Sequence, residues 1–379
     1  MKTILYKTTE EEIRSAAKVL ANGGLVAFPT ETVYGLGADA FNKDAAKKAY
    51  AAKGRPSDNP LIVHIAKFSD LYRLAPKELL DDEASENSLG TVVRKLANAF
   101  WPGPLTMILP KLPDVPKETT GGLDTVAIRM PKDEWTLKFI EYSGTLVSGP
   151  SANTSGYPSP TTWEHVKHDL DSKIDGIICG AASWGGIEST VISLLDLKEG
   201  VIKILRPGLV TPEMISDVTG LEVAYDEALL KKPTLDAKGN AGDDKDFHPM
   251  APGMKYKHYA PKAEMVLLQR SKDDSKETFM CKVEAYIEKE MMAGKKIVLV
   301  EPSAKSFYAD IRKADEEGAD LIVATVFDGA EFDGAEFDAA EFDGAENGSG
   351  VSGDSENVSL HFSVMNRVLK AAAYNIIEL

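Results

Sequence analysis

The hydrophobic pattern changes near the middle of the chain, and this change constrains the fold more than any other feature. Between about residues 223 and 261 the periodicity is lost and Lys, Asp, Gly and Pro become frequent, as in linkers between domains. The length of 379 residues also exceeds what one ordinary core accommodates. We therefore predict a domain at residues 1–222, a linker at 223–261 and a second domain at 262–379.

The first domain contains many short apolar runs separated by helical stretches. Thr9 and Glu12 form the Thr-x-x-Glu pattern of a helix start, and Gly23 follows the predicted helix. Residues 25–28 read as a buried strand that carries residues 29–32 to a strand end, where ligand groups collect in α/β folds. Further strands are predicted at residues 61–65, 105–109, 125–130, 145–148, 176–179, 189–195 and 201–205, with helices at 43–52 and about 92–100. So many strands favour a twisted mixed sheet flanked by helices over a simple alternating βαβ domain.

The second domain shows a strict alternation of strands and helices. Strands are predicted at residues 265–268, 296–300 and 321–326, and helices at 276–292, 304–316 and 360 to about 374. This order is typical of a small parallel, Rossmann-like sheet with right-handed crossovers. No Gly-x-Gly-x-x-Gly follows its first strand, so the sequence does not support dinucleotide binding there. The prediction for the whole chain is an α/β fold with two sheets.

Residues 327–357 form an acidic, low-complexity insertion in the second domain. Within it, residues 328–346 repeat a Phe-Asp-Gly-Ala-Glu unit with eight acidic residues and no Lys or Arg, and removing these eight changes the formal net charge from -16 to -8. The repeat lacks the glycine position and the closing Glu of a calcium loop. We interpret it as a solvated loop rather than a metal site.

Charge and cysteine content exclude several classes of protein. A formal net charge of -16 and a pI near 4.9 argue against a surface for duplex nucleic acid, because such surfaces need clustered Lys and Arg. The two cysteines, Cys179 and Cys281, are far apart, which argues against a disulfide framework or structural zinc. The chain begins without an apolar leader and has no apolar run of about 18 residues. We expect a soluble cytoplasmic protein.

Three separated segments carry residues suited to one anion pocket. The segments are residues 29–37, residues 53–60 and residues 148–153. Lys53 and Arg55 could simply complement the dipole of the preceding helix, but prolines on the loop rigidify it beyond what a cap requires. Ser151 and Asn153 could form a plain turn, but small neighbours would also let backbone N–H groups approach a phosphate. No P-loop pattern is present, so these segments are the best candidates for phosphate binding.

Arg129 and Arg206 lie, like Lys53 and Arg55, next to prolines near the ends of predicted elements. A nucleoside triphosphate carries about four negative charges and demands several converging cations, although each Arg alone could be a surface ion-pair partner. His64, in an apolar strand, could be a hydrogen-bonded core residue, but its place shortly after a proline loop favours the site. No Ser-His-Asp, paired-carboxylate or zinc-ligand pattern is evident. The predicted chemistry is positioning and electrostatics, with Mg²⁺ carried by the triphosphate.

Together these segments resemble the YrdC-type domain of L-threonylcarbamoyladenylate synthases in their long, two-domain form. The motifs that carry the resemblance are residues 23–37, Lys53-x-Arg55, and residues 59–64, 101–106, 122–131, 150–153, 188–191 and 205–208. Residues 251–261 also resemble the linker signature of the long form. The resemblance implies synthesis of L-threonylcarbamoyl-AMP from L-threonine, bicarbonate or CO2 and ATP, with release of pyrophosphate. This is the first step of N6-threonylcarbamoyladenosine (t6A37) formation in tRNA.

Under this resemblance the pocket divides into an amino acid half and a nucleotide half. Threonine would be held by Thr32, His64, Arg129, Gly149 and Ser189. ATP would be surrounded by Lys53, Arg55, Asn59, Thr125, Ser151, Asn153, Ser159, Arg206 and, from the linker, Tyr259. The catalytic group would be Lys53, Arg55, Ser151 and Asn153, and residues 256–261 would form a lid. The resemblance also implies Mg²⁺ with ATP, no metal ligand from the protein side chains, and transfer of the product to a tRNA threonylcarbamoyl transferase.

Two other functions are associated with this type of domain. One is a non-catalytic YrdC-type module that binds RNA or ribosomes; the acidic charge counts against it, and the complete Lys-x-Arg and Ser-x-Asn set favours the enzyme. The other is the hydrogenase-maturation carbamoyltransferase, whose cysteine-rich zinc fingers are excluded by a total of two cysteines. The acidic insertion departs from the family pattern and receives no functional interpretation.

Overall fold

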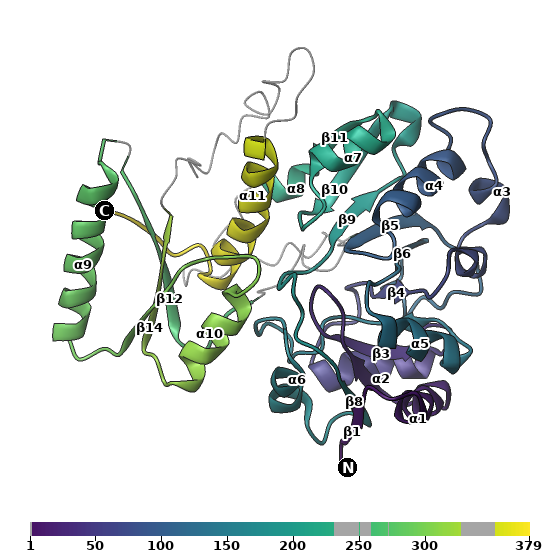
Figure 1. Cartoon of the computed structure of the whole chain (residues 1–379), viewed down its shortest axis with the longest axis horizontal. Helices are drawn as coiled ribbons and strands as arrows, with labels where there is room; N and C mark the ends of the chain where they lie inside the picture. The colour runs from purple at the N-terminus through teal and green to yellow at the C-terminus, as the bar shows by residue number, and fades with distance from the viewer. Residues whose placement is uncertain (1, 231–249, 251–258, 272, 327–352) are drawn as a thin grey trace.

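Two separate sheets organise the computed structural model, which describes residues 2–230, 250, 259–271, 273–326 and 353–379 (Figure 1). The larger sheet has eleven strands. From one edge to the other they are β1 (Ile4–Lys7), β8 (Gly176–Cys179), β2 (Val26–Phe28), β3 (Gly35–Asp39), β7 (Val147–Ser148), β4 (Ile62–His64), β6 (Thr125–Arg129), β5 (Leu105–Pro110), β9 (Thr190–Ser193), β10 (Val201–Arg206) and β11 (Glu222–Tyr225). Parallel and antiparallel pairs are mixed, since β6 runs parallel to β4 and antiparallel to β5. This arrangement confirms the predicted mixed sheet.

Helices pack along this sheet, and their ends follow the capping residues in the sequence. The helices are α1 (Glu10–Ala21), α2 (Lys43–Lys53), α3 (Lys77–Leu80), α4 (Leu89–Phe100), α5 (Glu134–Ser143), α6 (Trp163–Leu170), α7 (Pro212–Thr219) and α8 (Glu227–Leu230), with 3-10 turns η1 (Phe68–Arg73) and η2 (Leu197–Glu199). Asn42 caps α2 by accepting hydrogen bonds from the N–H groups of Asp44 and Ala45. Gly54 ends α2 with a φ of 64°, a left-handed conformation that favours glycine. This turn fixes where Lys53 and Arg55 leave the helix.

The smaller sheet is entirely parallel. Its strands are, in spatial order, β13 (Ile297–Val300), β14 (Leu321–Val326), β12 (Glu264–Gln269) and β15 (Ile376–Glu378), and its helices are α9 (Lys276–Met292), α10 (Phe307–Glu316) and α11 (Gly353–Ala371). The predicted Rossmann-like parallel sheet is therefore confirmed, and β15 extends it by one edge strand. In Figure 1, α10 and α11 lie on the side that faces the larger sheet, whereas α9 lies on the opposite side.

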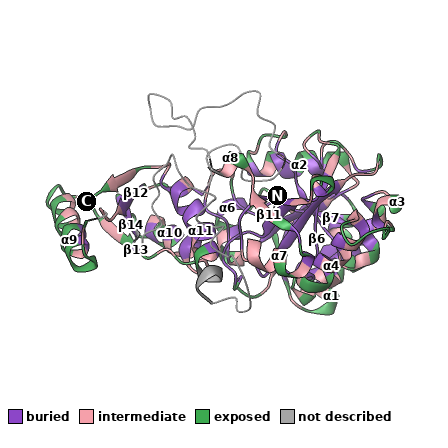
Figure 2. Ribbon diagram, turned by 90° about the horizontal axis from the view of Figure 1, so that it is seen from above, coloured by how far each residue is buried: buried purple, intermediate pink, exposed green. Residues whose placement is uncertain are grey.

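One hydrophobic cluster joins the two units. It includes Val33 and Ile187 from the first unit, Phe307 and Tyr308 from α10, and the linker residue Tyr259, all buried. Figure 2 shows that α10 and α11, which face the larger sheet, are largely buried, whereas α9 is exposed along much of its length. Helices α10 and α11 therefore pack directly against the part of the larger unit that carries the predicted site. No helix among the described residues is long and apolar enough to cross a bilayer.

Two elements of the structure lie partly within segments predicted to be linker or loop. Residues predicted to begin the linker form β11, which pairs in parallel with β10, so the larger sheet extends to Tyr225. A four-residue edge strand with half-buried side chains carries too little periodicity to be recognised. Helix α11 begins at Gly353, inside the predicted acidic loop. Most of that loop, and the predicted lid residues before Tyr259, lie outside the described residues.

Candidate active site

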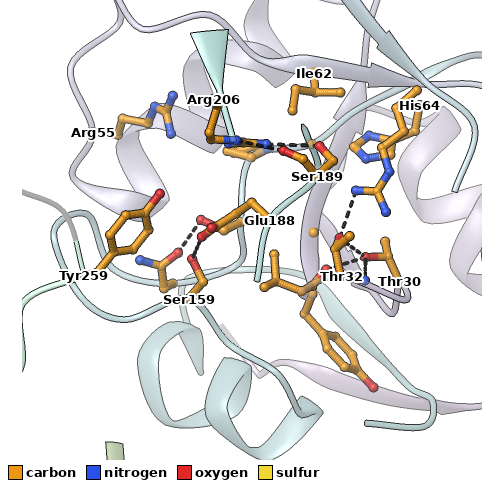
Figure 3. A pocket seen from close by; sticks show the side chains of 18 of the residues that line it. Thr30, Thr32, Arg55, Ile62, His64, Ser159, Glu188, Ser189, Arg206 and Tyr259 are labelled. Atoms are coloured by element: carbon orange, nitrogen blue, oxygen red, sulfur yellow. Dashed lines mark hydrogen bonds between the residues drawn. The ribbon is translucent and has the colours of Figure 1, made fainter. Parts of the chain in front are cut away.

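A cavity lies at the ends of the central strands, with the linker residue Tyr259 in its wall. Eleven of the sequence-predicted site residues line it: Thr32, Arg55, His64, Arg129, Gly149, Ser151, Asn153, Ser159, Ser189, Arg206 and Tyr259. Figure 3 shows Arg55 and Tyr259 on one side of the cavity, His64 and Thr32 on the other, and Ser189 and Arg206 between them. The predicted residues Lys53, Asn59 and Thr125 are not part of this lining.

The loop after β2 meets the end of β6 at Arg129. Arg129 Nη1 donates a 2.9 Å hydrogen bond to Thr32 Oγ1, and Nε donates to the carbonyl oxygen of Gly103. The hydroxyls of Thr30 and Thr32 share a further hydrogen bond of 2.8 Å. Behind the fork, Arg129 Nη2 lies 2.8 Å from the Glu31 carboxylate, and both side chains are almost fully buried. The guanidinium is therefore fixed in direction while donors remain for a second anion.

His64 is neutral in this environment. Its ring is buried at the end of β4 and packs edge-on against Phe28 with centroids 5.2 Å apart. Burial, with a smaller contribution from the Arg129 charge, lowers the pKa of His64 to about 3. Its Nδ1 has no hydrogen-bond partner among the described residues. His64 can therefore accept a hydrogen bond from a ligand, but its ring is a weak base and stays unprotonated near pH 7.

Gly149 leaves room beside this ring. A Cβ at position 149 would lie 2.9 Å from the Phe28 ring and 3.3 Å from His64 Cε1. Any side chain there would push against the aromatic wall of the amino acid half. The absence of a side chain thus lets the backbone approach the predicted threonine pocket.

Lys53 supports the Ser-x-Asn loop from behind instead of facing the cavity. Its Nζ donates to the carbonyl oxygens of Ser151 and Asn153 and to Asn153 Oδ1. These three acceptors use the three N–H groups of an ammonium. Burial and the nearby Arg55 charge lower the pKa of Lys53 well below its ordinary value. The physical reason for the difference from the prediction is that the loop turns its carbonyls toward the end of α2.

The Ser-x-Asn loop is internally bonded. Ser151 Oγ donates a 2.5 Å hydrogen bond to Asn153 Oδ1, while Asn153 Nδ2 donates to the carbonyl oxygens of Thr154 and Tyr157. Both side chains still line the cavity. Arg55 lies across from this loop; burial is the main reason that the pKa of its guanidinium is lowered to about 10. It still carries its charge near pH 7.

Asn59 and Thr125 occupy supporting positions. The Asn59 carbonyl oxygen accepts a 2.9 Å hydrogen bond from the Tyr50 hydroxyl, and the side chain is buried. Thr125 opens β6 and pairs in register with Pro110. Neither side chain reaches the cavity wall in this structure, so the predicted contact of each with ATP remains a prediction.

Arg206 and Ser189 connect the two halves. Arg206 Nε donates to the Ser189 carbonyl oxygen at 3.0 Å, and Nη2 donates to Ser189 Oγ at 3.1 Å. Ser189 Oγ also shares a 2.8 Å hydrogen bond with Thr106 Oγ1. Because β9 and β10 are antiparallel neighbours, their ends present both residues at one point of the sheet. Ser189 thus lies between a cation of the nucleotide half and the amino acid half.

Glu188 is a cavity residue that sequence reasoning did not single out. It accepts a 2.5 Å hydrogen bond from Ser159 Oγ and bonds from the Tyr308 hydroxyl at 3.2 and 3.0 Å. Arg367 of α11 lies 3.2 Å from its second oxygen. Burial raises the pKa of Glu188, but the charges of Arg367 and Arg206 outweigh it, and the pKa lies below its ordinary value. The signal available in the sequence was its place in the 188–191 motif.

Tyr259 is the described part of the linker at the cavity. Its side chain is buried, its ring centroid lies 5.2 Å from that of Tyr308, and its backbone has a φ of 66°. Burial and the Glu188 charge raise the pKa of the Tyr259 hydroxyl to about 12, so this hydroxyl keeps its proton. The next residue, Ala260, donates a backbone hydrogen bond to Gly156. The linker therefore returns to the structure against the nucleotide half.

The described residues contain no group of three or more His, Cys, Asp or Glu side chains that could hold a metal ion. Glu188, the one carboxylate on the cavity wall as described, is already engaged by a hydroxyl and an arginine. The donor set fits an anionic ligand better than a cation held by the protein alone.

Comparisons with known proteins cover both units of the chain. Residues 18–208 match a family model described as "Telomere recombination", and residues 210–373 match one described as threonylcarbamoyl-AMP synthase, C-terminal domain. A threonylcarbamoyl-AMP synthase of Pyrococcus abyssi is 40% identical, covering 97% of this chain and 96% of the relative. One of Bacillus subtilis is 39% identical over 98% and 96%. A crystal structure of P. abyssi Sua5 complexed with L-threonine has a TM-score of 0.77 and 38% identity, and covers all of both chains. The chain belongs to the threonylcarbamoyl-AMP synthase family.

Proposed function

We propose that this chain synthesises L-threonylcarbamoyl-AMP from L-threonine, bicarbonate or CO2 and ATP, with release of pyrophosphate, as a nucleotidyltransferase. The observation that carries the proposal is that one cavity joins a fixed guanidinium and a neutral imidazole to a second set of cations and small polar side chains. Such a cavity suits one amino acid and one triphosphate side by side. The relatives' names and the threonine complex of P. abyssi Sua5 support the same assignment.

The amino acid half would bind threonine through its carboxylate. Arg129 has one N–H on Gly103, one on Thr32 and one beside Glu31, which leaves one N–H on each terminal nitrogen for a carboxylate. The unpartnered Nδ1 of His64 would accept a hydrogen bond from the amine or the hydroxyl of threonine. Arg129 and the ammonium form of threonine are both positively charged, and a neutral His64 ring avoids adding a third positive charge beside them. Ser189 would complete this half.

The reaction forms one nitrogen–carbon bond, and it exchanges one oxygen–phosphorus bond for another. The free amine of threonine attacks CO2, a nitrogen–carbon bond forms, and the amine proton leaves to water. A carbamate oxygen then attacks the α-phosphorus, and the bond from that phosphorus to the β-phosphate oxygen breaks. Because two anions must meet, Arg55 and Arg206 would contribute mainly by neutralising the triphosphate and the departing pyrophosphate. Mg²⁺ bound to the ATP phosphates would supply further neutralisation.

The nucleotide half would be shaped by the Ser-x-Asn loop, with Lys53 holding the loop. Ser151 and Asn153 present side chains to the cavity, while the buried ammonium fixes their backbone from behind. This assigns Lys53 to positioning and leaves Arg55 in direct reach of the ligand. Tyr259 would cover the nucleotide as part of the lid predicted from the sequence. We further propose that the labile product passes to a tRNA threonylcarbamoyl transferase.

Direct product detection tests the proposal. The purified chain is incubated with ATP, MgCl2, bicarbonate and labelled threonine, and threonylcarbamoyl-AMP is sought by mass spectrometry, with bicarbonate omitted in a parallel reaction. Arg55→Ala should lose most of the product, whereas Arg14→Ala, on an exposed face of α1, should behave like the wild type. Absence of product from the wild type would refute the proposal. Thermal stabilisation by RNA, without stabilisation by threonine plus ATP, would favour a binding module instead.

A further inference from the structure

The smaller unit places a buried arginine behind Glu188, a residue of the cavity wall. Arg367 of α11 is fully buried, and its Nε lies 3.2 Å from Glu188 Oε2. Its Nη1 donates to the carbonyl oxygens of Pro207 and Ser363. Pro207 follows Arg206 directly, so this one guanidinium contacts Glu188 and the residue next to Arg206, and Glu188 and Arg206 line the cavity themselves.

Glu188 occupies the centre of this arrangement. Figure 3 shows its carboxylate between Ser159 and Ser189, with its hydrogen bond to Ser159 drawn. The Tyr308 hydroxyl of α10 donates to the same carboxylate, so two helices of the smaller unit contact it. A carboxylate that is 6% exposed is stable as an anion only when cations and donors surround it. Arg367 is the cation in direct contact, and Arg206 is the next that acts on it.

Removing Arg367 would change the direction of Glu188. The carboxylate would either take up a proton or turn toward another cation coupled to its charge, of which Arg206 is the one on the cavity wall. Turning toward Arg206 would compete with the two hydrogen bonds that Arg206 makes to Ser189. It would also release Ser159, whose hydroxyl is held by Glu188 at 2.5 Å. Two cavity residues would lose their positions together.

We propose that Arg367 is a positioning residue of the nucleotide half, which aligns Ser159 and Arg206 by fixing the carboxylate of Glu188. The inference rests on the proposed function, because it assigns the nucleotide to this half. It gives the second domain a defined role: α11 completes the ATP site without touching the ligand. The C-terminal family model spans residues 210–373 and so includes Arg367.

Kinetics of full-length variants test this role. Arg367→Met should raise the KM for ATP about tenfold or more, the effect of one lost charge-assisted hydrogen bond. The KM for threonine should rise less, because Ser189 is the one residue of the amino acid half that contacts Arg206. Arg367→Lys, which keeps the charge but loses the fork, should recover part of the loss. Ser359→Ala is the matched control, because Ser359 lies on the same helix and bonds Glu213 across the interface at 2.9 Å, away from the cavity. It should leave both KM values near those of the wild type.

A double variant separates positioning from stability. Arg367→Met leaves a buried carboxylate without its partner and could unfold the chain, whereas Arg367→Met with Glu188→Gln removes both charges and should fold. If Arg367 acts only through the carboxylate of Glu188, the KM for ATP of the double variant should be no higher than that of Glu188→Gln alone.

Three results would overturn the role: equal rises in both KM values, independent effects that multiply in the double variant, or the same defect in Ser359→Ala. Binding of a fluorescent ATP analogue is measured in parallel. A wild-type chain that binds nucleotide but forms no product would count against the proposed reaction, while its variants would still report on Arg367.

Discussion

The protonation of His64 gives a quantitative test of the amino acid half. Folding lowers the pKa of His64 from 6.5 to about 3, mainly by burial. The unfolded chain therefore binds a proton at His64 below about pH 6.5, while the folded chain does not until about pH 3. Above pH 6.5 His64 therefore does not lower the free energy of unfolding. As the pH falls from 6.5 toward 3, protonation of His64 in the unfolded chain lowers that free energy progressively. At pH 5 the loss is about 2 kcal/mol, from a difference of about 1.5 pH units at 1.36 kcal/mol each.

The measurement compares the wild type with His64→Gln at pH 7 and pH 5. The four tryptophans, Trp101, Trp135, Trp163 and Trp184, all precede the linker, so their fluorescence during urea unfolding follows the larger unit. The wild type should lose about 2 kcal/mol more than the variant between the two pH values. His165, whose pKa burial also lowers, is present in both proteins and cancels in the comparison. Equal pH sensitivity of the two proteins would refute a neutral, buried His64.

Four further substitutions probe the two halves of the cavity. Arg55→Ala should reduce kcat/KM about a hundredfold or more with little change in unfolding free energy, since the guanidinium would neutralise charge in the transition state; an unchanged rate of pyrophosphate release would contradict this. Lys53→Ala should also lose activity. Unlike Arg55→Ala, it should lower the free energy of unfolding by about 1–3 kcal/mol, because buried acceptors of the 151–153 loop lose their donor. Urea titration distinguishes the two variants. Arg129→Lys should raise the KM for threonine more than that for ATP, because the fork is lost, and a rise confined to ATP would argue against the assignment. Tyr259→Ala should raise the KM for ATP and increase the release of threonylcarbamoyl-AMP into solution, measured by mass spectrometry of the filtrate. Complete retention of this product by the variant would count against Tyr259 as a cover over the nucleotide.

Elements bounded by clear start and stop residues could be predicted from the sequence closely. The predicted helix at 276–292 and strand at 176–179 have the same bounds in the structure, as α9 and β8. Ser275 caps the helix and Gly294 lies just beyond it, while Gly180 follows the strand, so few alternative bounds remain. In contrast, β3 is built of Gly, Leu, Gly, Ala and Asp, and a strand with such small residues has no alternating pattern to detect. Long-range pairing with β2 and β7 creates it.

Which residues form the site could be predicted better than the directions in which their side chains point. Residues next to strand ends do converge, because central strands of one sheet bring His64, Arg129 and Gly149 together regardless of their distance along the chain. The direction of Lys53 could not be predicted, because it depends on which carbonyls the 151–153 loop turns toward α2. Glu31 was visible in the motif, yet its ion pair with Arg129 joins segments that only tertiary structure brings into contact.

The carboxylates near the cavity explain how a cation-rich site can also be stable. Glu31 and Glu188 each have a dedicated arginine: Arg129 beside the threonine half and Arg367 behind the nucleotide half. Buried anions that are neutralised locally do not cancel the field of the other cations, so Arg55 retains its effect on a triphosphate. In the proposed site, the amino acid half would use the same arginine for Glu31 and for the substrate carboxylate, whereas the carboxylate of the nucleotide half is neutralised by a residue of a different domain. The affinity for ATP should therefore depend on how α11 is docked more strongly than the affinity for threonine does.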